Sequence, residues 1–110
     1  MGFYRETPGP VQIRSSVYAD GVQVYVHIPS HLRNRLEVVV GHRMEGRIDR
    51  IESAGGMTRS IDAAVSLQVM GYWHELHLPD DVVQQFGIRP GDQAWITIHR
   101  IVRHGVAMDV

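Results

Sequence analysis

The sequence predicts a mostly β fold: one small β-barrel built from two β-β-α-β-β repeats in a single chain, with two short helices. Its 110 residues, 44% of them hydrophobic, can form one core and leave no room for a second domain. Short alternating segments between Gly and Pro turns favour strands. Residues 11–60 also align without gaps on residues 61–110, which predicts repeat 1 and repeat 2. Residues shared by the two include Ser16/Ser66, Gly21/Gly71, His27/His77, Pro29/Pro79, Gly41/Gly91, Arg50/Arg100, Ile51/Ile101 and Gly55/Gly105.

Each repeat begins with two predicted strands. Residues 14–19 and 64–70 alternate between apolar and polar side chains, which is typical of half-buried strands. The Asp20-Gly21 dipeptide favours a hairpin turn, and a glycine marks the same bend in repeat 2. Residues 22–28 and 72–78 then form the second strands. The side chains expected to point inward are Val24, Val26 and Ile28 in repeat 1 and Val65, Leu67, Val69, Leu76 and Leu78 in repeat 2.

A short helix is expected next in each repeat. Pro29-Ser30 and Pro79-Asp80 favour helix starts, and we expect the side chains of Ser30 and Asp80 to cap free amides there. The helices are amphipathic, because Leu32/Leu36 and Val82/Phe86 are spaced as i, i+4 pairs.

Turns at Gly41 and Pro90-Gly91-Asp92 lead into third strands at 43–51 and 93–101, in which Ile48 and Ile98 face inward. Short strands at 57–61 and 105–110 complete the repeats. One such unit cannot bury both faces of its sheet, whereas two interleaved units around a pseudo-twofold axis share one core. Residues 1–10 contain two Pro and two Gly and are predicted to be a flexible arm, which leaves 11–110 as a single barrel domain.

Composition excludes several kinds of chemistry. Without cysteine there is no disulfide, thiol nucleophile or Cys-ligated metal, and all 11 basic residues are arginine, so lysine chemistry is also absent. The chain has no signal-peptide-like or membrane-spanning apolar run, and we expect a cytoplasmic protein. Since no nucleophile elbow, phosphate loop or metal-ligand spacing is present, we expect neither an enzyme, a metal nor a cofactor.

The segment 77–98 consists of a strand ending in Leu-Pro, a short helix, Phe-Gly-Ile and a Gly-Asp turn before a strand. It resembles the AbrB/MazE/SpoVT family, and residues 27–41 are similar, with His42 in place of the Asp of the turn. The resemblance implies a swapped-hairpin, or cradle-loop, barrel acting as a DNA-binding transcriptional regulator or antitoxin-type module. In that family an arginine commonly lies four residues before the motif proline. Tyr25 and Glu75 occupy those positions here.

Charge divides unevenly between the repeats. Residues 11–60 hold seven arginines and five acidic residues, a net +2, whereas residues 61–110 have a net charge of −3. If duplex DNA is bound, the best phosphate contacts are Arg33, Arg35, Arg43 and Arg47. The alternative is a solvated face on which these arginines pair with Glu37 and Glu45.

Aromatic side chains support other functions. Alternation directs Tyr25, Trp73 and Trp95 outward, where they would form a patch for a protein partner or a homodimer, or else cover the barrel ends. A protein-interaction barrel that has lost DNA binding is therefore an alternative function, and a small-molecule site between the repeats is another. His27 and His77 either meet near the axis as a metal or proton-sensitive pair or are ordinary strand-end histidines.

Overall fold

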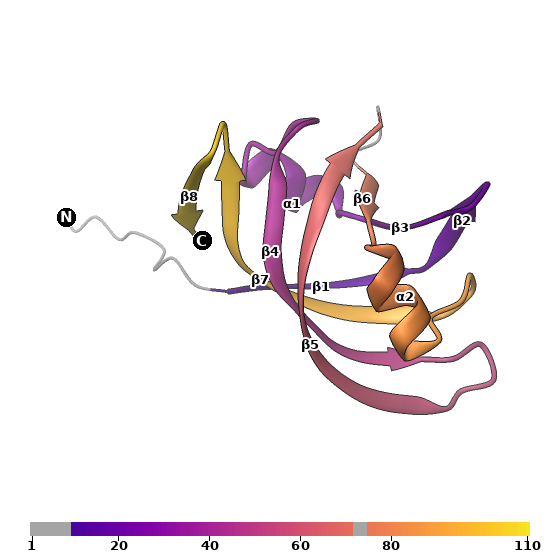
Figure 1. Cartoon of the computed structure of the whole chain (residues 1–110). Helices are drawn as coiled ribbons and strands as arrows, with labels where there is room; N and C mark the ends of the chain where they lie inside the picture. Colours follow the sequence, from indigo (N-terminus) through magenta and orange to yellow (C-terminus); the bar gives the residue numbers. More distant parts are fainter. Residues whose placement is uncertain (1–9, 72–74) are drawn as a thin grey trace.

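A computed structural model describes residues 10–71 and 75–110, and it is mostly β as predicted (Figure 1). One antiparallel sheet curls strongly around a single core, and two short helices lie against it. The strands are β1 (Val11–Ser16), β2 (Tyr18–Asp20), β3 (Gln23–His27), β4 (Arg43–Glu52), β5 (Thr58–Met70), β6 (Glu75–His77), β7 (Gln93–Arg103) and β8 (Val106–Asp109). The helices are α1 (Ser30–Arg35) and α2 (Asp80–Phe86).

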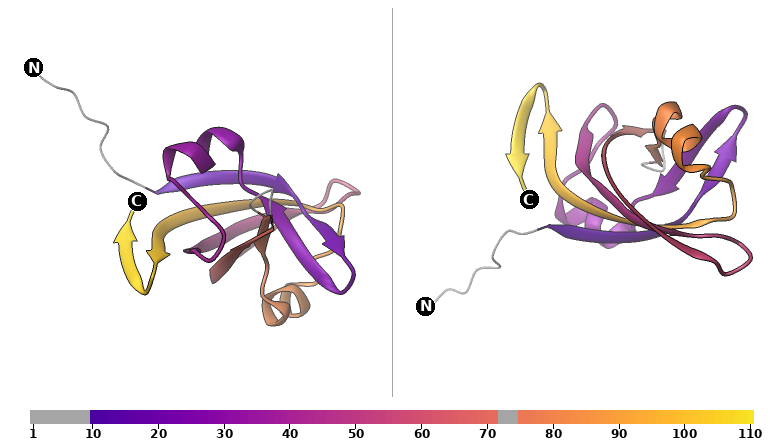
Figure 2. Two further views of the ribbon diagram at one scale, coloured as in Figure 1. Left: turned by 90° about the horizontal axis from the view of Figure 1, so that it is seen from above. Right: turned by 60° about the horizontal axis from the view of Figure 1, so that its bottom comes forward.

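The strand order makes the sheet turn back on itself. It runs β1-β7-β4-β5-β6-β3-β2, with β8 pairing beside β1 on β7. The two ends of this path, β1 and β2, are consecutive in the chain and separated only by Val17, whose backbone bonds Asp92 and Gly91 at 2.7 and 2.8 Å. The curled arrangement in Figure 2 is therefore consistent with a small β-barrel.

Strand register follows the 50-residue offset between the predicted repeats. In the β4–β7 ladder Arg43 pairs with Val102. The equivalent residues of the other repeat are Gln93 and Glu52, and these two also pair. Arg47 pairs with Thr97, its own counterpart, and so does Val26 with Leu76 in the β3–β6 ladder. The β1–β7 and β4–β5 ladders are the equivalent ladders of the two repeats, and their registers differ by two residues: Val11 pairs with Ile98, but Ile48 pairs with Ala63. The geometry is pseudo-twofold in these central ladders, and the duplication itself stays a prediction.

The core lies inside the curl and consists of the predicted inward residues. Every side chain assigned inward is buried: Val24, Val26, Ile28, Ile48, Val65, Leu67, Val69, Leu76, Leu78 and Ile98. Ile13, Met44, Ile51 and Ile96 complete the layer with less than 2% exposure each. Hydrophobic burial from both halves therefore stabilises one shared core.

The helices occur where they are predicted but begin differently. Leu32 and Val82 are buried and Leu36 and Phe86 partly buried, which confirms the i, i+4 stripes. The prediction that Ser30 and Asp80 cap the helices is wrong, because the N-cap residues are Pro29 and Pro79 and neither helix has a side-chain cap. Each proline is extended, so Ser30 and Asp80 already lie in the first turn.

The strands 57–61 and 64–70, predicted as separate, form the single strand β5 of 13 residues. Asp62 has a φ of 54°, and the register with β4 shifts at the same level, between Ile48 and Arg50. This bulge bends β5 without interrupting it, so one long strand takes the place of two. Residues 72–74 of the predicted strand 72–78, and residues 1–9 of the predicted arm, lie outside the described part of the chain. Within the described ranges, no helix has the length and apolar character needed to cross a membrane.

Candidate functional site

The four predicted phosphate-binding arginines are distributed over two elements. Arg33 and Arg35 lie on α1, and Arg43 and Arg47 lie on β4. Arg35, Arg43 and Arg47 each line a different hollow, and Arg33 lines none of these three hollows. Arg47 forms an ion pair with Asp62 at 2.8 Å and also donates to its backbone carbonyl.

A different arginine pair meets on the outer face of the sheet. Arg14 on β1 and Arg50 on β4 both pair in register with Trp95 on β7, the strand between them. Their guanidinium carbons lie 4.9 and 4.2 Å from the indole ring, within the range of cation–π attraction. Because Ile13, Ile51 and Ile96 point into the core, alternation turns these three neighbours outward. We call Arg14, Trp95 and Arg50 the Arg-Trp-Arg row.

No ion pair offsets the charges of this row within the described residues. Arg14 and Arg50 are exposed, and neither guanidinium forms an ion pair with a carboxylate among the described residues. Asp49 precedes Arg50 on β4. Its carboxylate accepts a 2.6 Å hydrogen bond from the Thr97 hydroxyl and a 3.4 Å hydrogen bond from the Gln12 side-chain amide. The row therefore leaves two cations available for an anionic ligand.

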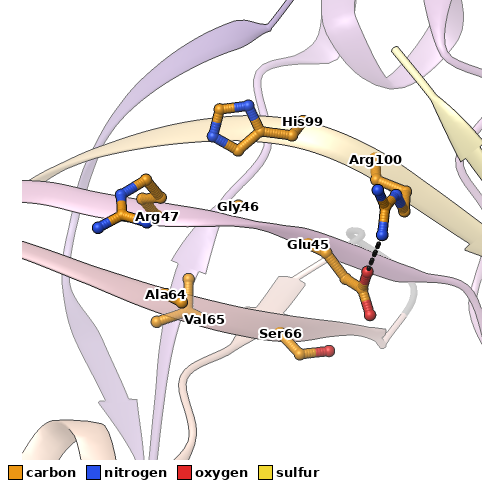
Figure 3. Close-up of a pocket in the computed structure, with 8 residues that line it drawn as sticks. All are labelled: Glu45, Gly46, Arg47, Ala64, Val65, Ser66, His99 and Arg100. Atoms are coloured by element: carbon orange, nitrogen blue, oxygen red, sulfur yellow. Dashed lines mark ion pairs between the residues drawn. The ribbon is translucent and has the colours of Figure 1, made fainter.

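Next to the row, a hollow of about 500 Å³ opens over β4, β5 and β7 (Figure 3). The small side chains of Ala64 and Ser66 line it on β5. Figure 3 shows the side chains at its edge, which are Arg47 and Glu45 from β4 and His99 and Arg100 from β7. Arg100 lies 3.6 Å from Glu45 and 3.3 Å from Asp109, so its charge, like that of Arg47, is partly compensated. Positive charge on this face is thus least neutralised at the Arg-Trp-Arg row.

The predicted aromatic patch is not formed as expected. Tyr25 is only 7% exposed, because the ring of Tyr18 on β2 stacks on it with ring centres 5.7 Å apart. The Tyr25 hydroxyl donates a hydrogen bond to the Gln23 side chain. Trp95 is half-buried beside its two arginines, and Trp73 lies outside the described residues. Alternation placed Tyr25 on the outer side of the sheet but could not reveal that β2 covers it.

The predicted histidine pair is bridged by aromatic rings. Tyr18 stacks on His27 at 4.5 Å, and Tyr25 contacts His77 edge-on at 5.6 Å, so the two tyrosines connect the two imidazoles. Burial and a 2.5 Å hydrogen bond to Glu75 raise the pKa of the Tyr18 hydroxyl, which keeps it protonated. The described part of the chain contains no group of three residues suited to hold a metal ion. The rings of this cluster pack against one another, and within the described residues the buried His77 Nε2 has no hydrogen-bond partner.

Arg14 and Arg50 were not among the predicted site residues. Their outward orientation follows from strand alternation, and both stand in the arginine-rich first half. Their meeting at Trp95, however, depends on the pairing of β1 with β7, two strands at opposite ends of the sequence.

Comparison with known proteins adds no assignment to this geometry. No family model, no curated protein and no solved structure matches the chain. The resemblance to the AbrB/MazE/SpoVT family is therefore carried by the sequence motif alone.

Proposed function

We propose that this protein is a non-catalytic nucleic-acid-binding module that contacts its ligand with the outer face of β1, β7 and β4. The Arg-Trp-Arg row is the observation that carries the proposal. Two arginines flank an indole on adjacent strands, and neither forms an ion pair within the part of the chain that the structure describes. Arginine next to an aromatic ring is a common means of contacting phosphates and bases.

The row also has the physical properties that phosphate binding requires. An arginine held over an indole loses less side-chain entropy on binding than a free one, and its N–H edge remains open for a bidentate contact with phosphate oxygens. Ser60, the β5 partner of Arg50, adds a neutral hydroxyl beside the row, and the carboxylate of the neighbouring residue Asp49 accepts hydrogen bonds from Thr97 and Gln12. Compared with the four arginines predicted from the sequence, this proposal moves the contact to Arg14 and Arg50 and leaves Arg47 at its margin. A narrower role as a transcriptional regulator or antitoxin has its support in the family resemblance alone.

Salt-dependent binding tests the proposal. Fluorescence anisotropy with labelled random duplex and single-stranded DNA should show binding at low salt that weakens as salt rises, because counterions are released from the phosphates. The double variant Arg14→Gln/Arg50→Gln should make the slope of log affinity against log salt shallower by about 1.4–1.8, since each phosphate contact contributes about 0.7–0.9. The proposal fails if neither DNA binds at about 100 µM protein in low salt, the weak end of non-specific affinity.

A matched variant separates the row from net charge. Arg89→Gln removes the same charge as Arg50→Gln from an exposed turn between α2 and β7. Arg50→Gln should weaken binding clearly more than Arg89→Gln does. Equal losses would mean that only overall charge matters. In a Trp73→Phe background, the remaining Trp95 fluorescence should also change on binding, which reports contact at the row itself.

A further inference from the structure

A second hollow, of about 260 Å³, lies at the N-terminal end of β4, whereas Arg50 lies near the C-terminal end of that strand. Three segments that are distant in sequence enclose it: the turn after α1 with the start of β4, the strand β5, and the end of β7 with the turn that follows it. Its polar side chains are His42, Arg43, Gln68 and His104. None of the residues that line it carries a carboxylate.

Two of these residues supply positive or potentially positive charge at the surface. Arg43 is exposed and forms no ion pair among the described residues. His104 lies in the two-residue turn between β7 and β8, where it and Gly105 have φ values of 52° and 80°. This left-handed turn holds the His104 ring edge-on to His42, with ring centres 5.9 Å apart.

The buried His42 ring has a defined tautomer. Its Nδ1 accepts a 3.3 Å hydrogen bond from the Val39 backbone N–H, so in the neutral ring the proton is on Nε2. Burial, and then the charges of Arg103 and His104, lower the pKa of His42. The positive charges of Arg103 and His104, which lower this pKa in addition to burial, also favour an anion beside the ring.

We infer that this hollow is a binding site for a phosphate group, either inorganic phosphate or the terminal group of a phosphate monoester. Arg43 and His104 would supply charge, and the amide of Gln68 would donate a hydrogen bond to a phosphate oxygen. The volume is below the roughly 300–1,000 Å³ that is usual for larger ligands, which favours a small anion or one end of a molecule. The inference does not depend on the proposed nucleic-acid surface, because the Arg-Trp-Arg row takes no part in it.

Histidine NMR combined with thermal unfolding tests this site. The protein is titrated at pH 7 with inorganic phosphate, phenyl phosphate, dimethyl phosphate or chloride at constant ionic strength. We expect saturable shifts of the His42 and His104 ring signals and a rise in Tm with phosphate and phenyl phosphate only. Weak, linear shifts equal to those with chloride would overturn the site. Saturable binding of dimethyl phosphate with equal affinity would also overturn it and assign the hollow to a phosphodiester.

Variants connect the binding to the named residues. Arg43→Gln should reduce phosphate affinity about tenfold or more, since a charge-assisted hydrogen bond is lost. His104→Asn is a second variant, because asparagine tolerates the left-handed turn conformation. Arg50→Gln, which tests the proposed nucleic-acid surface, should leave phosphate affinity unchanged. Undiminished affinity in both Arg43→Gln and His104→Asn, with a native circular dichroism spectrum, would contradict the assignment.

Discussion

His42 and Asp92 occupy equivalent positions in the two halves and perform the same structural task with different chemistry. The Asp92 carboxylate accepts a 2.9 Å hydrogen bond from the Arg89 backbone N–H, and His42 Nδ1 accepts one from Val39. A carboxylate remains an acceptor down to acidic pH, whereas an imidazole accepts only while it is neutral. The substitution in the first half therefore keeps the turn but makes it sensitive to pH.

We expect His42→Asp to reduce the loss of stability below neutral pH. The folded-state pKa of His42 is lowered by burial and then by Arg103 and His104, so folding favours the neutral ring. That contribution to stability is complete above the unfolded pKa of about 6.5 and is lost as pH falls through the lowered folded value. Urea unfolding at several pH values between 7.5 and 4.5 measures the effect. His31→Gln, at an exposed position on α1, should behave like wild type. An unchanged pH dependence in His42→Asp would refute this linkage.

Glu37 is held in a backbone conformation that favours glycine. It follows α1 with a φ of 53°, and the corresponding residue after α2 is Gly87, with a φ of 60°. Glu37→Gly should raise the free energy of unfolding by about 0.5–1 kcal/mol, because it relieves the steric cost of a left-handed residue. Gly87→Ala should lower that free energy by about 1 kcal/mol. Denaturant unfolding of both variants measures these changes in the free energy of unfolding. A destabilised Glu37→Gly protein would show that contacts of the Glu37 side chain stabilise the fold by more than its backbone conformation costs.

The β4–β7 ladder permits no side chain at Gly46. A Cβ there would lie 1.8 Å from the Thr97 carbonyl oxygen and 2.9 Å from the Ile98 Cα. Gly46→Ala should therefore separate the two strands and cost about 3 kcal/mol, the upper part of the range for overpacking. Gly55→Ala is the matched control, because a Cβ there meets nothing closer than the Ser53 hydroxyl at 3.9 Å. Equal Tm values for the two variants would mean that the ladder can shift at this point.

Most strands and both helices could be predicted because each follows from local patterning. The alternation of Val65, Leu67 and Val69 and the turn at Asp20-Gly21 need no long-range information, and both predictions are confirmed. The continuity of β5 could not be predicted, since it depends on Asp62 adopting a positive φ opposite a shifted partner strand. Proline as the N-cap was also missed, because Ser30 and Asp80 are themselves favourable capping residues.

The two halves share one sheet and one core in this fold. β1, from the first half, finds its ladder on β7 from the second, and β5 finds its ladder on β4. The location of the candidate site was missed for the same reason. Arg33 and Arg43, which are close in sequence, lie on different elements, whereas Arg14 and Arg50 meet at Trp95 from the other half.

We expect neither half to fold alone as a monomer. Residues 1–60 would leave β1 and β4 without the β7 strand that lies between them, and exposed apolar surface would remain on both faces. The separate halves 1–60 and 61–110 should either unfold without a cooperative transition in circular dichroism or self-associate into larger species in size-exclusion chromatography. Mixing the halves should restore a cooperative transition. A monomeric half with a sharp melt would contradict shared folding.

The pairing of β1 with β7 also has a consequence for biosynthesis. Val11 pairs with Ile98, so β1 has no ladder partner until nearly the whole domain has been translated. Since the ribosomal exit tunnel still covers the most recently made residues, the sheet can close only after translation of this domain is complete. Until then β1 and β4 present open strand edges to other nascent chains, and this interval is when the protein is most exposed to aggregation and most dependent on chaperones.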